Sequence, residues 1–256
     1  MKNALVILAG GEGKRIKSSK IPKQFIQINS QNLIEYFLNN LDPNIFDIIK
    51  IVVKKNFRKK YLSNLKKKFN YHKINFVESG KYRQNSSKKG LLSLKKMNPE
   101  KVLIHDAARP LVSNALIKKI LNKLDKFEAC TPYIKHNDLI KKKLSKDFFD
   151  ISLLMHIQTP QGFKFKSILK AHQLNMLVDC KDDTTLTESI GIRTKFIKGD
   201  KFNIKITYKE DIDLFQKLKK NEKRHGIGYD IHKINYLSKK KLKLCGVKIN
   251  HPPLIS

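Results

Sequence analysis

Glycines and basic residues gather in a short segment near the N-terminus. Residues 8–15 read LAGGEGKR, and residues 22–25 follow with PKQF. Glycines let the backbone approach a phosphate chain, and lysine and arginine supply the charge that holds it. The segment is not a Walker A loop, because no Ser or Thr follows the lysine, and it lacks the third glycine of a dinucleotide fingerprint. An ordinary strand-to-helix turn has a similar composition, but together with PKQF the segment favours phosphate binding by Gly10, Gly11, Gly13, Lys14, Arg15 and Lys23.

A second group of reactive side chains follows an apolar run. Residues 105–112 read HDAARPLV, so Asp106 ends a stretch in which a carboxylate is costly without a metal ion or a polar partner. Asp106 is therefore a candidate metal ligand. Arg109 follows on the same turn and has two interpretations: it binds a substrate, or it pairs structurally with Asp106.

Apolar runs and helix-like stretches alternate through the first half of the chain. This alternation predicts an α/β fold whose mostly parallel sheet is covered on both faces, with the active site at the carboxyl ends of the strands. Residues 134–157 break the pattern and predict a protruding hairpin or arm. The expected strands are residues 4–9, 48–53, 74–77, 102–105 and 129–134, and the expected helices are residues 33–41, 58–69, 88–97 and 114–124.

The second half continues the pattern and then changes character. We expect a helix over residues 165–174, a strand over 194–197 and a closing amphipathic helix over 209–220. Residues 219–223 are polar and predict a linker, after which a new strand-like start with its own glycines appears. The sequence thus predicts one domain over residues 1–220 and a second segment over residues 221–256.

The composition narrows the class of protein. No apolar run is long enough to span a membrane, and the three cysteines, Cys130, Cys180 and Cys245, are widely spaced, which favours reduced thiols and a cytoplasmic location. The formal net charge of +32 is compatible with a nucleic-acid-binding protein. Such a protein would carry aromatic residues between clustered basic ones, whereas these lysines are spread along the whole chain, so we expect no nucleic-acid partner. Anionic substrates would still be attracted.

Three further motifs identify a family. QTPQGF at residues 158–163, KDDTTLTE at 181–188 and GDKFNIKIT at 199–207 accompany HDAARPLV and the glycine-rich loop. Together, over about residues 2–219, they resemble 2-C-methyl-D-erythritol 4-phosphate cytidylyltransferases. The resemblance implies a Rossmann-like nucleotidyltransferase fold, transfer of CMP from CTP to a polyol phosphate, dependence on Mg²⁺ and a homodimer.

The resemblance also implies roles for single residues. Arg15 and Lys23 match two basic residues that stabilise the α-phosphate and the leaving pyrophosphate, and residues 10–14 match the loop around the triphosphate. Asp106 matches a residue near magnesium and the ribose. Ala107 matches a backbone contact to the nucleotide, and Arg109 lies beside it. The segment that reads cytosine corresponds to Gly80, Arg83 and Ser86.

Four residues that match the family have a simpler structural explanation as well. Ser86 stands near a helix start, where serine often serves as N-cap, and both roles are compatible. Lys205 matches a lysine that contacts the acceptor's phosphate, although strand alternation would otherwise turn it to solvent. Asp182 and Asp183 resemble the family's acidic pair, and helix capping explains them equally well.

The chain departs from the family in its acceptor site. Leu139 stands where a threonine is usual, and Ile151 stands near the usual place of an arginine from the neighbouring subunit. Both usual residues hold the acceptor's phosphate, and the lysines at 141–143 are candidate substitutes. An alternative function is therefore cytidylyl transfer to another polyol phosphate, such as ribitol 5-phosphate.

The last residues resemble a different family. RHGIGYDIHKI and LKLCGVKI are similar to the opening of 2-C-methyl-D-erythritol 2,4-cyclodiphosphate synthases, in which an Asp-x-His pair binds a divalent metal such as zinc. Asp230 and His232 would point the same way on a strand, as ligands of one metal must. A third ligand is expected beyond residue 256, so we expect a truncated cyclase segment without cyclase activity.

Overall fold

The computed structural model describes residues 2–13, 21–28, 30–135, 139–141, 149–174, 180, 182–220, 242–244 and 247–249. The chain divides into two compact units, Met1–Lys219 and Lys220–Ser256. In the second unit, β9 (Leu242–Leu244) and β10 (Val247–Ile249) form an antiparallel pair. That residues 221–256 belong to a second domain stays a prediction.

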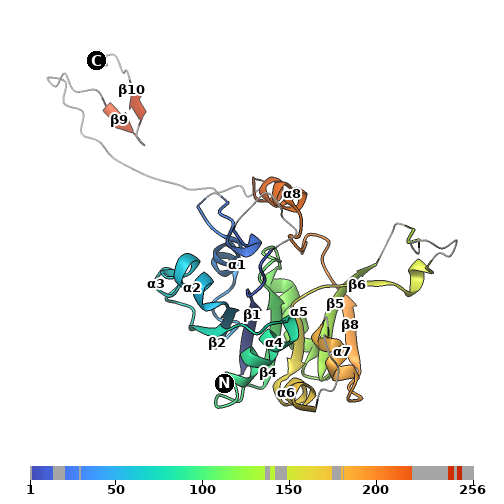
Figure 1. Ribbon diagram of the computed structural model, residues 1–256. Coiled ribbons are helices and arrows are strands. Elements are labelled where there is room, and N and C mark those ends of the chain that lie inside the picture. Colours follow the sequence, from blue (N-terminus) through green and yellow to red (C-terminus); the bar gives the residue numbers. More distant parts are fainter. Residues whose placement is uncertain are drawn as a thin grey trace, which may run out of the picture. The chain divides into compact units, whose positions relative to one another are not determined.

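The first unit is built on an eight-stranded sheet with the order β3-β2-β1-β4-β7-β5-β6, and β8 pairs with β5 (Figure 1). The pairs β1·β2, β1·β4, β2·β3 and β5·β8 are parallel, whereas β6 and β7 run against their neighbours. The predicted mostly parallel sheet is confirmed. The strands are β1 (Asn3–Leu8), β2 (Ile48–Val53), β3 (Ile74–Glu78), β4 (Lys101–Asp106), β5 (Ala129–Lys135), β6 (Met155–Ile157), β7 (Gln161–Lys164) and β8 (Thr194–Lys198).

Helices cover both faces of this sheet, as predicted. Leu5 and Ile7 of β1 pack in one apolar cluster and Ala4 and Val6 in another, because successive side chains of a strand point to opposite faces. A strand buried on both faces is largely apolar, which explains the near-continuous apolar runs, although polar side chains such as Lys50 of β2 are buried as well. Helices α1 (Leu33–Asn40), α2 (Lys55–Tyr61), α3 (Leu65–Lys68) and α5 (Asn114–Lys123) pack in the first cluster, and α4 (Arg83–Leu92), α6 (Phe165–Leu174) and α7 (Asp183–Glu188) in the second.

Two predicted helices have different bounds. The helix expected over residues 58–69 is divided into α2 and α3, because the chain turns at Leu62 so that both Leu62 and Leu65 enter the core. The helix expected over residues 88–97 is α4, which begins five residues earlier, at Arg83. Asn85 stabilises this start, since its Oδ1 accepts a hydrogen bond from the backbone N–H of Tyr82 at 3.3 Å.

The predicted arm is formed by β5 and β6, which pair antiparallel at the edge of the sheet (Figure 1). A short 3₁₀ helix, η2 (Ile151–Leu153), precedes β6. Apolar side chains are exposed in this region, including Leu139 at 68% and Leu153 at 78%. Within the described residues the arm thus presents an apolar surface to solvent.

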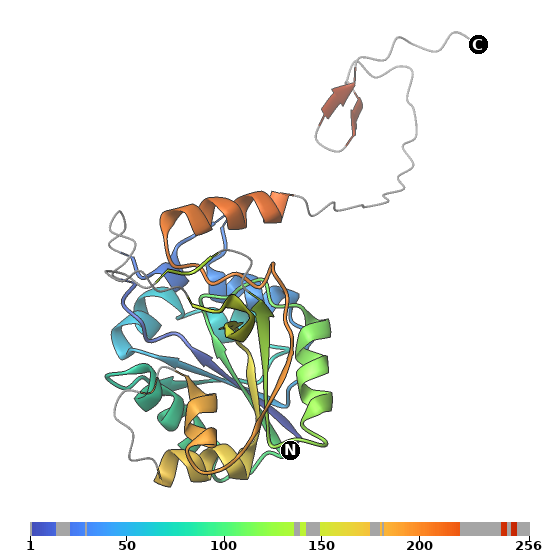
Figure 2. The same ribbon diagram turned by 90° about the vertical axis from the view of Figure 1, so that its right-hand side faces the viewer.

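Helix α8 (Lys209–Lys220) closes the first unit. The helix lies beside α1 (Figures 1 and 2). Its Phe215 packs edge to face on Tyr36 of α1, with ring centroids 5.0 Å apart, in a cluster that also contains Ile206. A strand was expected around Lys205, but residues 203–207 do not form one. They run as an irregular segment that is tied to the β4 end by the Ile206 N–H, which donates to the carbonyl of Ala108 at 2.8 Å.

No helix in the described part of the chain is long and apolar enough to cross a membrane.

Candidate functional site

The glycine-rich loop follows β1 at the carboxyl edge of the sheet. Gln24 supports it, because its Nε2 donates to the carbonyls of Ala9 at 2.8 Å and Gly11 at 2.6 Å. A Cβ at Gly10 would lie 2.6 Å from the Cβ of Ser79, so this position requires glycine. Gly13 has a φ of +70°, a conformation that glycine adopts at low cost. Lys14 and Arg15, both predicted to bind phosphate, lie outside the described residues.

Lys23 connects this loop to the NIKIT segment. It begins the 3₁₀ helix η1 (Lys23–Phe25), and its Nζ donates to the carbonyl of Ile206 at 2.5 Å. Phe25 is buried in the core and anchors η1. Two motifs 183 residues apart in the sequence therefore meet at one place.

Asp106 occupies the end of β4 and is the centre of the charged site. Its Oδ2 lies 2.7 Å from the Nζ of Lys205, and its Oδ1 lies 3.4 Å from the Nε of Arg83. Burial would raise the pKa of this carboxyl, but Arg83, Lys205 and Arg109 outweigh burial and hold the pKa well below its usual range. Asp106 is therefore a carboxylate throughout the physiological pH range.

Hydrogen bonds from buried polar groups stabilise the turn after β4. The backbone N–H of Asp106 donates to the Oγ1 of Thr159 at 3.1 Å, and the same oxygen lies 3.2 Å from Nδ1 of His105. Burial lowers the pKa of His105 to about 4, so the ring is neutral near pH 7. The Ala107 N–H donates to the carbonyl of Leu8 at 3.1 Å. The predicted nucleotide contact of Ala107 would thus have to be made by its carbonyl oxygen.

Arg109 bonds to the backbone of two other segments. Its Nη1 donates to the carbonyl of Asn203 at 2.6 Å and its Nη2 to that of Ile157 at 3.4 Å. Burial lowers the pKa of Arg109, and the charge of Asp106 partly opposes that effect. Among the described contacts Arg109 braces the NIKIT segment rather than forming a hydrogen bond with Asp106. Its predicted role in substrate binding stays a prediction.

The segment predicted to read the base lies between β3 and α4. The Ser86 Oγ accepts from the Gly80 N–H at 3.0 Å and donates to the Tyr82 carbonyl at 3.1 Å. A Cβ at Gly80 would come within 2.3 Å of the Cβ of Asn85, so glycine permits this close approach. The N-cap of α4 is Tyr82, and the N-cap interpretation of Ser86 is therefore wrong.

The two neighbouring aspartates at the start of α7 make different contacts. Asp182 is the N-cap, and its Oδ1 accepts from the Thr185 N–H at 2.9 Å. Asp183 instead points to Arg83, whose Nη1 lies 2.6 Å from its Oδ2. Capping thus explains Asp182 but not the side chain of Asp183.

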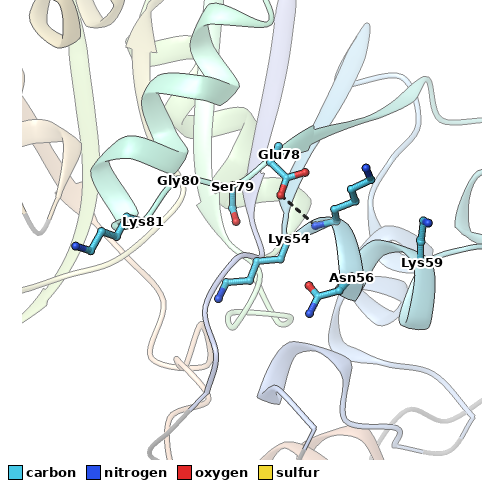
Figure 3. A pocket seen from close by; sticks show the side chains of 8 residues that line it. Lys54, Asn56, Lys59, Glu78, Ser79, Gly80 and Lys81 are labelled. Atoms are coloured by element: carbon cyan, nitrogen blue, oxygen red, sulfur yellow. Dashed lines mark hydrogen bonds between the residues drawn. The ribbon is translucent and has the colours of Figure 1, made fainter.

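A cavity of about 610 Å³ opens at the carboxyl ends of β2 and β3, beside the segment that is predicted to read the base (Figure 3). Ser79 and Gly80 form one wall of the cavity. Lys54 also lines it and forms an ion pair with Glu12 of the glycine-rich loop. The Glu78 carboxylate accepts from the Lys55 N–H at 3.3 Å. The ammonium groups here would attract anionic ligands. Lys54, Lys55 and Lys59 belong to no motif, so they could not be singled out in the sequence among so many lysines. The cavity is lined by Lys54, Lys55, Asn56, Lys59, Glu78, Ser79, Gly80 and Lys81.

The structure thus brings together most of the predicted site that it describes. Sequence reasoning missed the residues that support it, Gln24, Thr159, Ser87 and His172, although Gln24 and Thr159 stand within the PKQF and QTPQGF motifs. Asp230 and His232 lie outside the described residues. Within the described part of the chain no three His, Cys, Asp or Glu side chains are grouped as metal ligands.

Known proteins resemble this chain in sequence. The sequence model of the 2-C-methyl-D-erythritol 4-phosphate cytidylyltransferase family matches residues 3–218. The cytidylyltransferase of Thermotoga neapolitana is 32% identical over 87% of this chain and 99% of its own length. The bifunctional enzyme IspD/IspF of Wolbachia pipientis is 35% identical over 98% of this chain, which spans only 65% of that relative's length.

Solved structures resemble it as well. The 4-diphosphocytidyl-2C-methyl-D-erythritol synthase of Anaerococcus prevotii has a TM-score of 0.73 at 27% identity, over 86% of this chain and 98% of its own. The bifunctional IspDF of Campylobacter jejuni has a TM-score of 0.70 at 29% identity, over 83% of this chain and 54% of its own.

Proposed function

Because the chain belongs to the 2-C-methyl-D-erythritol 4-phosphate cytidylyltransferase family, we propose that it transfers CMP from CTP to 2-C-methyl-D-erythritol 4-phosphate and releases pyrophosphate. The observation that carries this proposal is the convergence of Lys23, Asp106 and Lys205 at the carboxyl ends of β1 and β4. These residues come from three motifs that are far apart in the sequence.

The reaction is a phosphoryl-group substitution. A phosphate oxygen of the acceptor forms a bond to the α-phosphorus of CTP, and the bond between that phosphorus and the pyrophosphate oxygen breaks. No covalent bond to the protein is required, so the protein acts by positioning and by stabilising charge. Lys23 and Arg15 would stabilise the α-phosphate and the leaving pyrophosphate, and the loop around Gly10, Gly11 and Gly13 would contact the triphosphate.

Asp106 is the residue that would hold Mg²⁺. Magnesium is usually bound through one or two carboxylates together with substrate phosphates, so a single ionised carboxylate beside a phosphate-binding loop fits it. The ion would neutralise charge on the phosphates. Lys205 pairs with Asp106 at 2.7 Å, and its side chain is 40% exposed, so an anionic acceptor can reach its ammonium group. Lys205 therefore fits a role in holding the acceptor's phosphate.

The acceptor site contains the two departures from the family. Leu139 is exposed, and Ile151 begins η2 on the arm. Lys141 lies in the same region, whereas residues 142–143 are outside the described part. We propose that lysine replaces the usual phosphate-binding residues here. Ribitol 5-phosphate remains the alternative acceptor, and the likeness to named methylerythritol phosphate enzymes does not favour it.

A homodimer would cover the apolar surface of the arm. Leu139, Phe149 and Leu153 are exposed there, and exposed apolar patches commonly mark protein interfaces. Cys130 and Cys180 are thiols that form no disulfide in the described part of the chain, which is compatible with the expected reducing cytoplasm. Sedimentation analysis of the purified chain should give twice the monomer mass; a monomer at micromolar concentration would contradict the dimer.

For the C-terminal segment, similarity to bifunctional relatives supports a link to the cyclase family. We keep the proposal that Asp230 and His232 are two ligands of a divalent, zinc-like metal. Two ligands alone should hold it weakly. Zinc binding by this chain should accordingly be abolished by His232→Ala, and unchanged zinc affinity would contradict the assignment.

The transfer reaction is tested with the purified chain, CTP, Mg²⁺ and each polyol phosphate, by measuring pyrophosphate release. We expect release with 2-C-methyl-D-erythritol 4-phosphate, little with ribitol 5-phosphate, and none without an acceptor or after chelation of the metal. Equal release from UTP or ATP, or without any acceptor, would contradict the proposal.

A further inference from the structure

A buried network of hydrogen bonds and ion pairs lies next to the candidate nucleotide site and is centred on Asp183. Asp183 belongs to α7, and not to the glycine-rich loop or to the end of β4. We propose that Asp183 is a positioning residue that holds the Arg83 guanidinium between itself and Asp106, so that Arg83 can contact the nucleotide. The inference rests on the proposed nucleotide function of this edge of the sheet.

Arg83 bridges two carboxylates that come from different elements. Its Nη1 lies 2.6 Å from the Oδ2 of Asp183, and its Nε lies 3.4 Å from the Oδ1 of Asp106. The shorter contact is therefore with Asp183, which belongs to α7, and not with the carboxylate at the β4 end. The orientation of the guanidinium is determined mainly by Asp183.

Asp183 is itself held in place from three sides. Its Oδ1 accepts from the Ser87 Oγ at 2.6 Å and lies 3.0 Å from the His172 Nε2, while its backbone N–H donates to the Oε1 of Gln161 at 3.2 Å. The Asp183 side chain is only 1% exposed. Ser87 lies four residues after Arg83 on the same face of α4, so one helix supplies both partners. This arrangement leaves the carboxylate little freedom.

The charge of Asp183 is maintained despite its burial. Burial would raise the pKa of this carboxyl, but Arg83 and the hydrogen bonds from His172 and Ser87 lower it to about 2. A buried charge that loses its partner is strongly unfavourable. Removal of the Asp183 charge should therefore displace Arg83 rather than leave it where it is.

Arg83 has a donor left over for a ligand. Its Nη2 is buried and makes no hydrogen bond within the described part of the chain. Arg83 lies between Gly80 and Ser86, which line the candidate base-reading segment. A buried donor of this kind is normally satisfied by a polar partner. The Arg83 side chain as a whole is 24% exposed, so a bound nucleotide can reach the guanidinium and supply that partner.

The test compares Asp183→Asn with Asp182→Asn in the full chain. The control removes the same charge one residue away, and asparagine still caps α7 well. We expect Asp183→Asn to raise KM for CTP by about 10- to 100-fold, as loss of a charged hydrogen-bond partner does, with KM for the acceptor changed less than about threefold. Asp182→Asn should leave both KM values within about threefold of wild type.

A double-mutant cycle then separates positioning from a general structural effect. If Asp183 acts through Arg83, adding Asp183→Asn to Arg83→Gln should raise KM for CTP no further than Arg83→Gln alone. The inference would be overturned if Asp183→Asn raised KM for CTP as much in the Arg83→Gln background as in the wild type. It would also be overturned if Asp183→Asn raised KM for CTP and KM for the acceptor by the same factor. If Asp183→Asn does not fold, Ser87→Ala tests the same network more mildly and should raise KM for CTP selectively. An unchanged KM for CTP in Ser87→Ala and Asp183→Glu would then overturn it.

These results are distinct from failure of the proposed function. Absence of CTP-dependent pyrophosphate release by the wild-type chain would contradict the function itself. Normal wild-type turnover with an unchanged KM for CTP in Asp183→Asn would contradict only the role of Asp183.

Discussion

The Nζ of Lys205 lies 2.7 Å from the Oδ2 of Asp106 and joins the NIKIT segment to the end of β4. This ion pair brings a cation and a carboxylate together, and Lys23 joins the same segment because its Nζ donates to the carbonyl of Ile206. Lys205 is 40% exposed in its side chain, so a substrate can reach it without a change in the core.

Replacement of Lys205 tests its role in holding the acceptor. Lys205→Ala should lower kcat/KM for the acceptor by about 100-fold or more, because the variant lacks a cation that would stabilise the negative charge on the phosphates in the transition state. Thermal stability should change little, since the side chain is partly exposed. Lys205→Arg is the matched variant and should retain more activity. Steady-state kinetics with varied acceptor check this, and an unchanged kcat/KM in Lys205→Ala would refute the assignment.

Lys23 is predicted to act on the reacting phosphates. Lys23→Ala should lower kcat by at least about 100-fold while the circular dichroism spectrum remains that of the wild type. The fold should survive because Gln24 and Phe25, not Lys23, are the buried residues of η1. Lys166→Ala, an exposed lysine on α6, is the control for loss of one charge and should keep normal kcat. Full activity of Lys23→Ala would remove this residue from the mechanism.

The glycines of the loop should differ in their tolerance of a side chain. In Gly10→Ala the new Cβ would meet the side chain of Ser79 at 2.6 Å, and overpacking of this kind costs about 1 to 3 kcal/mol. In Gly11→Ala it would meet nothing within 4 Å, so the free energy of unfolding should change by less than about 0.5 kcal/mol. Urea denaturation measures both. Equal stability of the two variants would mean that the loop does not pack on Ser79.

The buried carboxylate of Asp183 should contribute to acid sensitivity. Its pKa is about 2 in the folded chain and about 3.9 when unfolded, so the unfolded state binds the proton more readily. Its contribution is present above pH 4 and is lost as the pH falls from about 4 to 2, by an amount of about 2 to 3 kcal/mol. Unfolding free energies of Asp183→Asn should fall less steeply than those of the wild type in this window. Identical slopes would contradict the ion pair.

The sequence indicated the strands that carry an apolar run better than the two short strands β6 and β7. Strands β1, β2 and β4 consist mostly of buried apolar residues because helices cover both sides, although Lys50 interrupts β2 and polar residues end β4, and such runs are visible without a structure. Strands β6 and β7 are short, and β7 contains Gly162, where a Cβ would lie 2.4 Å from Ile120. A glycine that is needed for close helix packing looks in the sequence like a turn residue, so β7 was missed.

Site residues could be predicted where they belong to a sequence motif. They could not be predicted where their role comes from a contact with a residue that is distant in the sequence. Asp106 and Lys205 were found separately, but their contact depends on how residues 203–207 return to the β4 end. Gln24 and Thr159 act on backbone groups, and amides or hydroxyls in loops are too common to single out. Asp182 and Asp183 are adjacent and chemically identical, so only the orientation of α7 distinguishes the cap from the partner of Arg83.

The most direct test of the proposed transfer is identification of its product. Purified chain, Mg²⁺, CTP and 2-C-methyl-D-erythritol 4-phosphate should yield, by mass spectrometry, a cytidine diphosphate ester of methylerythritol in equal amount to the pyrophosphate released. Asp106→Asn should form about 100-fold less of it under the same conditions. Release of pyrophosphate without that diphosphate ester, or equal formation of the corresponding ester from ribitol 5-phosphate, would contradict the proposed function.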